Sequence, residues 1–249
     1  MFEPNETEEV PFQSAVKCAI ATMTDKIISS ESDLLGVCFY GTKEKNNLNE
    51  FEDIYVFQDL DVPDAQRILQ LESLLKHEDS PFGSTENEFP FCDALWTCST
   101  MFSNCTTKVA HKRIFLFTND DNPNYGNDAV REQSLQRAKD LSELGIDIEL
   151  FSINKTNETF DPTKFFENII SFGEDEFIGH INFDASAKFE ELRARVRRKE
   201  FKKRTSGTIP FSLKPGFEIA VSVYKLISET KKNSYIWLGK YFPRNGKPF

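Results

Sequence analysis

Long hydrophobic segments are missing from this sequence of 249 residues. Its longest apolar runs, residues 34–40 and 114–117, are far shorter than the roughly 20 residues that a transmembrane helix needs. Residues 1–9 are acidic and contain neither the basic nor the apolar region of a signal peptide. The sequence therefore predicts neither a membrane span nor secretion.

Cysteines are few, and their number, five, is odd. Most of them lie inside apolar runs, and they lack the paired spacing that is typical of metal ligands. We therefore expect reduced side chains in the core of an intracellular protein. The five residues are Cys18, Cys38, Cys92, Cys98 and Cys105.

Charge is distributed very unevenly along the chain. Residues 1–190 carry 15 Lys and Arg against 36 Asp and Glu, a balance of −21, whereas residues 191–249 carry 15 against 4, a balance of +11. A strongly acidic globule repels a polyanion. Any contact with nucleic acid is therefore expected to begin late in the chain.

Apolar periodicity predicts alternating helices and buried strands over most of the chain. Such alternation favours an α/β fold, with a parallel or mixed sheet and helices on both faces. Residues 34–40 have no polar alternation, which is typical of a parallel strand covered on both faces. The expected helices are 12–28, 63–75, 91–102, 128–144, 162–170 and 187–203, and the expected strands are 34–40, 54–57, 113–118 and 146–153.

The pattern changes after residue 205. Residues 209–213 and 218–226 flank the turn Lys214-Pro215-Gly216, which predicts a β-hairpin in a region of a different kind. No internal repeat and no low-complexity segment interrupts the chain. The sequence thus favours one large α/β domain with a short appended β region.

Several motifs occur along the chain in a characteristic order and spacing. The most specific is HKRIFLFTN at residues 111–119, continued by 121–123 and 126–128. Shorter motifs occur at residues 26–30, 33–35, 39–42, 54–56, 67–69, 169–171, 174–176, 195–197 and 199–200. Together they resemble the smaller subunit of the Ku family of DNA-end-binding proteins, and the resemblance covers essentially residues 1–230.

This resemblance implies a two-part architecture. Residues 1–204 would form a Rossmann-like, von Willebrand factor A-like open sheet with helices on both faces, lacking the first strand of the family's sheet. Residues 205–249 would be the start of the β-barrel DNA-binding domain, which in this family belongs to a ring around a DNA end.

The resemblance also implies a function and partners. The protein would pair with the larger, eighty-kilodalton Ku subunit, bind double-stranded DNA ends without reading sequence, and recruit end-joining factors. Its roles would be non-homologous end joining and telomere maintenance, in the nucleus and on chromosomes. This segment would act mainly as a protein-interaction platform and not as an enzyme.

Eight basic residues are the candidate DNA-binding set. They form a cationic stripe that could face phosphates, although a solvated helix face or a nuclear import signal would have the same composition. The stripe lacks interleaved Asn or Gln, so base-specific readout is not expected. The residues are Arg193, Arg195, Arg197, Arg198, Lys199, Lys202, Lys203 and Arg204.

An enzymatic alternative rests on two lysines. The family is associated with ATP-dependent DNA helicase activity and with a 5′-deoxyribose-phosphate lyase that forms a Schiff base, and Lys108 and Lys112 match secondary lysines of the lyase. An amine must lose its proton to attack, and the sequence gives neither lysine a reason for a depressed pKa. No G-x-x-x-x-G-K motif followed by Ser or Thr occurs, so no nucleotide site and no cofactor is predicted.

A third alternative is a generic A-domain binding module that needs a metal ion. The family fold places a Thr-Asp-Gly where this chain has Thr118-Asn119-Asp120, so Asn119 replaces the principal carboxylate. Acidic side chains are common in turns for local reasons. No metal site is therefore predicted.

Overall fold

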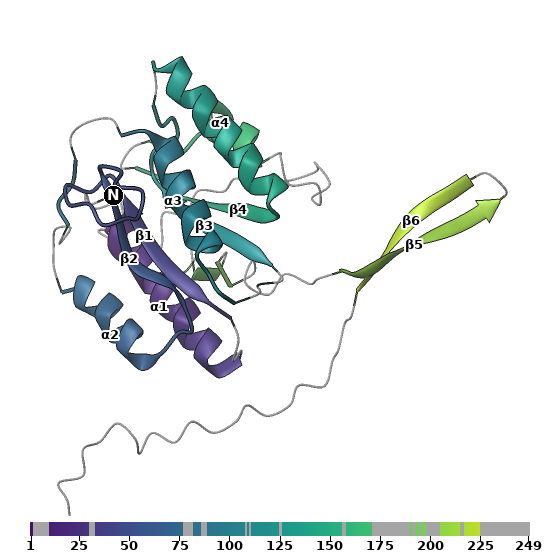
Figure 1. Ribbon diagram of the computed structural model, residues 1–249, viewed down its shortest axis with the longest axis horizontal. Coiled ribbons are helices and arrows are strands. Elements are labelled where there is room, and N and C mark those ends of the chain that lie inside the picture. Colours follow the sequence, from purple (N-terminus) through teal and green to yellow (C-terminus); the bar gives the residue numbers. More distant parts are fainter. Residues whose placement is uncertain are drawn as a thin grey trace, which may run out of the picture.

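The structure is a computed structural model of the chain (Figure 1). It describes residues 1, 10–29, 33–76, 82–85, 89–107, 109, 111–124, 126–155, 158–170, 190, 193–194, 196–197, 205–214 and 217–224. Within these residues, no helix is both long enough and apolar enough to span a bilayer.

Most helices and strands begin and end close to the residues expected from the sequence. The helices are α1 (Pro11–Ser29), α2 (Ala65–Leu74), α3 (Phe91–Ser103), α4 (Asp128–Glu143), the 3-10 turn η1 (Pro162–Lys164) and α5 (Phe166–Ile170). The strands are β1 (Leu35–Tyr40), β2 (Ile54–Asp61), β3 (Lys112–Thr118), β4 (Ile146–Ser152), β5 (Thr205–Lys214) and β6 (Phe217–Tyr224). Most of the helix expected over residues 187–203 lies outside the described residues.

β3 and β4 pair in parallel, and α4 connects them. Their register runs without interruption from Lys112 opposite Ile146 to Thr118 opposite Ser152. The side chain of Asn127 caps α4 by accepting the N–H of Val130 at 3.3 Å. After α4, Gly145 adopts a φ of +68°, which a residue without Cβ tolerates best. This strand–helix–strand unit confirms the prediction for residues 113–153.

β1 and β2 pair antiparallel. The expectation that residues 34–40 form a parallel strand was therefore wrong with respect to β2, the described strand with which β1 pairs. Parallel neighbours need a crossover connection, usually a helix. Residues 41–53 form a loop without one, so the chain can only turn back on itself. An apolar run without alternation indicates cover on both faces, and it does not determine the direction of the neighbouring strand.

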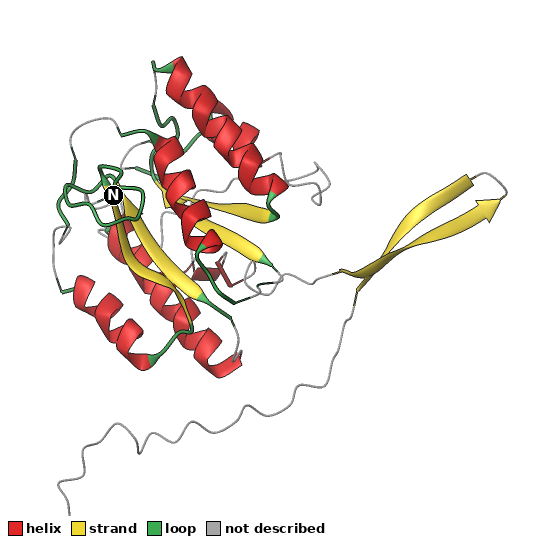
Figure 2. Cartoon of the chain, in the orientation of Figure 1, coloured by secondary structure: helices red, strands yellow, loops and turns green. Residues whose placement is uncertain are grey.

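Helices cover both faces of the strands, as predicted (Figure 2). On one face, α1 and α2 pack against Leu35, Val37 and Phe39 of β1. On the other, α3, α4 and α5 enclose a core that includes Phe91 and Leu116. Each fully buried aromatic or aliphatic side chain contributes about 1.5–3 kcal/mol relative to exposure. The arrangement is a three-layered α/β body.

β1 and β3 face each other without strand pairing. The described strands of the body form two separate pairs, β1–β2 and β3–β4. The Tyr40 hydroxyl at the end of β1 donates a hydrogen bond to the carbonyl oxygen of Phe117 in β3, at 3.4 Å. All six residues of β1 stay only partly buried although the strand is apolar. The edge of β1 and the edge of β3 that face each other are therefore less buried than the edges of a central strand normally are.

β5 and β6 form an antiparallel hairpin with a sheet of its own. The register places Ile209 opposite Val221 and Phe211 opposite Ile219, so these apolar side chains share one face. All four are exposed, and Figure 1 shows the hairpin apart from the α/β body. The predicted hairpin is therefore present, while its membership of a β-barrel stays a prediction, since residues 225–249 lie outside the described part.

Amide exchange should alternate along β3. The N–H of Ile153 donates to the carbonyl of Thr118 at 2.9 Å, so the backbone groups of Thr118, and of Leu116 two residues earlier, point toward β4. Those of Phe115 and Phe117 point toward the edge that faces β1. We expect the amides of Phe115 and Phe117 to exchange at least tenfold faster than those of Leu116 and Thr118.

Hydrogen–deuterium exchange followed by NMR on the chain measures this directly. Equal protection of all four amides would contradict the pairing of β3 with β4 alone. It would mean that a further strand occupies the edge of β3.

Candidate functional site

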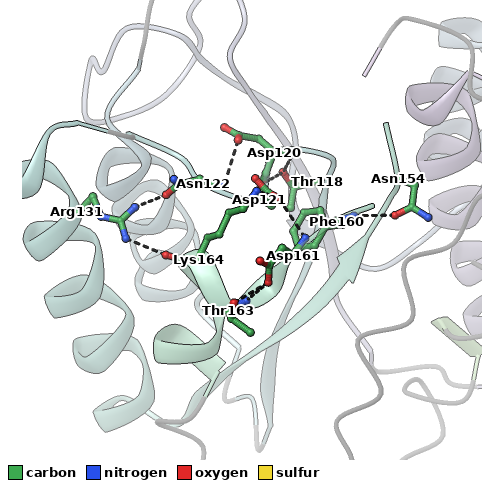
Figure 3. Close-up of polar contacts among 10 residues, drawn as sticks. All are labelled: Thr118, Asp120, Asp121, Asn122, Arg131, Asn154, Phe160, Asp161, Thr163 and Lys164. Atoms are coloured by element: carbon green, nitrogen blue, oxygen red, sulfur yellow. Dashed lines mark hydrogen bonds and ion pairs between the residues drawn. The ribbon is translucent and has the colours of Figure 1, made fainter. Parts of the chain in front are cut away.

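Polar side chains gather where β3 and β4 end, which is the usual position of ligand sites in open α/β folds (Figure 3). They come from the end of β3, the loop after it, α4, the segment after β4 and η1. We call this group the β3-edge polar cluster. Its members are Thr118, Asp120, Asp121, Asn122, Arg131, Asn154, Asp161, Thr163 and Lys164.

Asp121 forms an ion pair with Lys164. The ammonium lies 2.6 Å from Oδ2 of Asp121, and the same oxygen accepts the backbone N–H of Asp161 at 3.2 Å. The hydrogen bond and charge of Asp121 raise the pKa of Lys164 above its usual range. The contact therefore favours the charged ammonium and disfavours the neutral amine that a nucleophile needs.

Arg131 joins α4 to the other two parts of the cluster. Its guanidinium donates to Oδ1 of Asn122 and, at 3.0 Å, to the backbone carbonyl of Lys164. It also lies over the ring of Phe165, 5.1 Å from the centroid, in a cation–π contact. Phe165 is almost fully buried, so Arg131 connects the surface cluster to the core.

The remaining members satisfy one another locally. Oδ1 of Asp161 accepts from the Thr163 hydroxyl at 2.7 Å and from the Thr163 amide at 3.0 Å, and these bonds lower the pKa of Asp161. The amide of Asp120 donates to the Thr118 hydroxyl at 3.2 Å. Asx-type and capping bonds of this kind stabilise a turn without needing a ligand.

The loop after β3 is also fixed to α3. Asn124 has a φ of +60° and accepts the first helical amide, that of Phe91, at 3.0 Å. Its side-chain amide donates to the carbonyl of Phe89 at 2.6 Å. The whole edge is therefore a set of side chains that tie strand, turn and helix together.

The residues present do not fit the cation site of the family fold. Position 119 offers an amide instead of a carboxylate, and Asp121 is already neutralised by Lys164. Within the described residues, no group of three or more His, Cys, Asp or Glu side chains is placed to hold a metal ion. The expectation that this chain binds no metal stays a prediction.

Lys112, one of the two lyase candidates, lies away from this cluster. Lys112 begins β3 and pairs with Ile146, at the opposite end of the strand from Thr118. Lys108 lies outside the described residues. The role of either lysine in a lyase therefore stays a prediction.

Only two residues of the basic stripe are described, and both lie beside α1. Arg193 and Arg197 are exposed, whereas Val196 between them is buried against Cys18 and Phe151. Burial raises the pKa of the Cys18 thiol to about 12, and the charge of Arg193 partly opposes that shift. This turn thus presents a cationic side to solvent. The other six residues, Arg195, Arg198, Lys199, Lys202, Lys203 and Arg204, lie outside the described part.

Sequence reasoning missed Arg131 and Lys164. Arg131 sits within a polar helix face, and Lys164 follows Pro162 at the start of an expected helix, so neither stands out by spacing. Lys164 pairs with a residue 43 positions earlier. The one signal in the sequence was the acidic pair Asp120-Asp121, which requires a cation or solvent to balance it.

Replacing either cation should have unequal effects. Arg131→Met loses two hydrogen bonds and a cation–π contact, and we expect it to destabilise the chain by about 1–3 kcal/mol. Lys164→Met breaks a partly exposed ion pair, in which the side chains of Lys164 and Asp121 are 46% and 18% exposed, so its urea midpoint should change less. Because Asp121 raises the pKa of Lys164, that small difference from the wild type should vanish as pH rises through the raised pKa.

Urea denaturation of the wild type and both methionine variants, at neutral pH and above pH ~10.5, tests this ranking. A larger loss for Lys164→Met than for Arg131→Met would show that the ion pair, and not the arginine, holds the edge together.

Comparison with known proteins identifies the family. The family model described as the Ku70/Ku80 N-terminal α/β domain matches residues 1–206. The chain is 49% identical over 262 aligned residues to the Dictyostelium discoideum protein named ATP-dependent DNA helicase ku70, covering 94% of this chain and 29% of the relative. It is 39% identical to X-ray repair cross-complementing protein 6 of Mus musculus, covering 93% and 39%.

Two solved structures were compared with the chain, and the one with a TM-score above 0.5 shows likeness in fold alone. The PilB minor pilin from Streptococcus sanguinis matches with a TM-score of 0.51 at 11% identity, over 78% of this chain and 54% of that one. A structure titled as the SpRpn10 VWA domain matches with a TM-score of 0.47 at 14% identity, over 66% and 71%.

The chain spans about a third of the length of the curated relatives named above. The family model, by contrast, covers most of the chain and includes every described element of the α/β body. The predicted von Willebrand factor A-like α/β fold is confirmed, and the chain belongs to the family of Ku70/Ku80 N-terminal α/β domains.

Proposed function

We propose that the protein is a subunit of a heterodimer that binds double-stranded DNA ends without reading sequence, in non-homologous end joining and telomere maintenance. The observation that carries this proposal is the family match over residues 1–206, followed directly by a cationic β region. The α/β body acts mainly as a platform for other proteins. Two relatives carry names that refer to DNA helicase activity and to X-ray repair.

Charge supports this division of labour. The balance of −21 over residues 1–190 disfavours phosphate contact by the body, and +11 over residues 191–249 favours it. Arg193 and Arg197 are exposed where the sign changes. The eight-residue basic stripe is accordingly proposed to contact phosphates, which gives affinity without base specificity.

The exposed hairpin supports pairing with the larger, eighty-kilodalton Ku subunit. Contiguous exposed apolar faces on a folded protein commonly mark interaction surfaces. The apolar face of β5–β6 is one such face, and no element of the body packs extensively on it among the described residues. Its exposed side chains are Ile209, Phe211, Ile219, Val221 and Val223.

The proposal includes a location and further partners. A subunit acting at DNA ends works in the nucleus, on chromosomes, and recruits end-joining factors to those ends. The acidic body, kept away from DNA by its charge, leaves its surface for those factors. No membrane partner is proposed.

The enzymatic alternatives have less support. The sequence holds no nucleotide-binding motif that would explain the helicase activity in the names of relatives. For a lyase, borohydride trapping on abasic DNA discriminates: an adduct that disappears on Lys108→Ala plus Lys112→Ala would support it. A metal-dependent A-domain module conflicts with Asn119 and with the Asp121–Lys164 ion pair.

A mobility-shift competition tests the leading proposal. The natural protein in complex with the larger Ku subunit should bind blunt linear DNA at least tenfold more tightly than closed-circular DNA of the same sequence. Arg193→Gln plus Arg197→Gln should weaken binding and reduce the salt slope by up to about 0.9 for each lost phosphate contact. Lys155→Gln, which removes an exposed charge from the acidic body, is the matched control.

Equal or tighter binding to circles would overturn the proposal. An unchanged salt slope in the double arginine variant would remove those two residues from the DNA-binding set.

A further inference from the structure

An aromatic side chain is exposed on the outer side of α3. Trp96 is 43% exposed, while its neighbours Phe91 and Leu95 point into the core. The Arg137 guanidinium of α4 lies 3.8 Å from the centroid of the indole ring, and the Phe51 ring meets it edge-on at 5.7 Å. The loop that holds Phe51 also exposes Leu48, at 76%. We call Leu48, Phe51, Trp96 and Arg137 the Trp96 surface.

The loop beside Trp96 is held in one shape. The side chain of Asn47 accepts the N–H of Phe51 at 2.9 Å and donates to the carbonyls of Phe51 and Ile54 at 2.7 and 3.0 Å. The Asn49 side chain donates to the Thr100 hydroxyl of α3 at 3.1 Å. A surface that is ordered before binding loses little conformational entropy when a partner arrives.

Backbone strain in the same loop also indicates that the loop is ordered before a partner binds. Glu50 and Asp53 have φ values of 57° and 60°, a region that costs free energy for residues other than glycine. They flank Phe51 and fix the direction in which its ring points. Such strain persists only where the surroundings over-determine the backbone.

Three carboxylates lie on the elements that form the Trp96 surface. Glu50 and Glu52 have side chains 82% and 72% exposed in the loop, and Asp140 lies beside Arg137 on α4. The two nearby cations are already paired, because Lys45 lies 2.6 Å from Glu52 and Arg137 lies 3.1 Å from Asp140. These five groups carry a net charge of −1, within a body whose balance over residues 1–190 is −21, and this charge disfavours phosphate and favours a cationic partner.

We propose that the Trp96 surface docks a short basic peptide segment of a partner protein, with an aromatic or long aliphatic anchor. The anchor packs on Leu48, Phe51 and the exposed part of Trp96. Its flanking Lys or Arg residues pair with Glu50, which lies 3.9 Å from Lys45, and share the exposed Glu52 carboxylate with Lys45. Trp and Arg are the residues most enriched among side chains that dominate binding energy. This assignment rests on the platform role proposed above for the α/β body.

Synthetic peptides test the assignment without a known partner. A fluorescein-labelled set varies net charge and anchor independently, with Phe, Leu or Ser as the anchor, and binding to the full chain is read by anisotropy. In a Trp237→Phe background Trp96 is the one remaining tryptophan, so its emission reports contact at this surface. We expect saturable binding of basic peptides with Phe or Leu, a change in Trp96 emission, and little binding of acidic or Ser peptides.

Variants distinguish specific binding at the Trp96 surface from nonspecific binding of peptides to the protein. Leu48→Ser and Glu50→Gln plus Glu52→Gln alter exposed side chains, and each should weaken binding roughly tenfold. Leu69→Ser on α2, at a residue 64% exposed on another surface, is the matched control and should bind normally. Equal loss in Leu69→Ser, charge-independent binding, or no saturable binding would overturn the assignment. So would concentration-dependent self-association lost on Leu48→Ser, since the occupant would then be a second copy.

The assay contains neither DNA nor the larger Ku subunit. A negative result in the peptide assay would therefore not contradict DNA-end binding, and a negative mobility-shift test would not contradict peptide binding.

Discussion

The parallel pairing of β3 with β4 is the constraint on which the other layers depend. Phenylalanine side chains pack against this pair on both sides: Phe151 stacks on Phe117 at 5.0 Å toward α1, and Phe165 and Phe166 meet Phe91 edge-on beneath α3. Helices on opposite faces of the sheet thus pack against the same two strands. A change in the register of this pair would move both cores at once.

The polar edge of the same pair follows from that packing. Because β3 and β4 end together, the segments that follow them meet. Asp121, in the turn after β3, therefore lies beside Lys164, in the segment after β4. Arg131 then connects the edge to Phe165 below. The position that serves as a ligand site in related folds fastens elements together in this chain, which leaves the surfaces of the body and the cationic region beyond it to contact partners.

The exposed features are distributed in a way that fits two kinds of partner. The acidic body presents Trp96 near Glu50 and Glu52, whereas the basic stripe follows the body in the sequence, where the sign of the charge changes. Electrostatics keeps these roles apart, since a phosphate backbone and a basic peptide select opposite potentials. The proposed phosphate contacts and the proposed peptide surface therefore lie in parts of the chain with opposite charge.

The sequence by itself determined the approximate positions of the helices that the structure describes, the strand–helix–strand unit over residues 113–153, the late hairpin and the change in charge. These depend on local periodicity, turn chemistry and composition, which act within a few residues. The tertiary structure alone decided that β1 runs antiparallel to β2, that Asp121 meets Lys164, and that Trp96 is exposed beside Arg137. Those outcomes depend on segments tens of residues apart coming together, and spacing along the chain does not encode which side chains then meet.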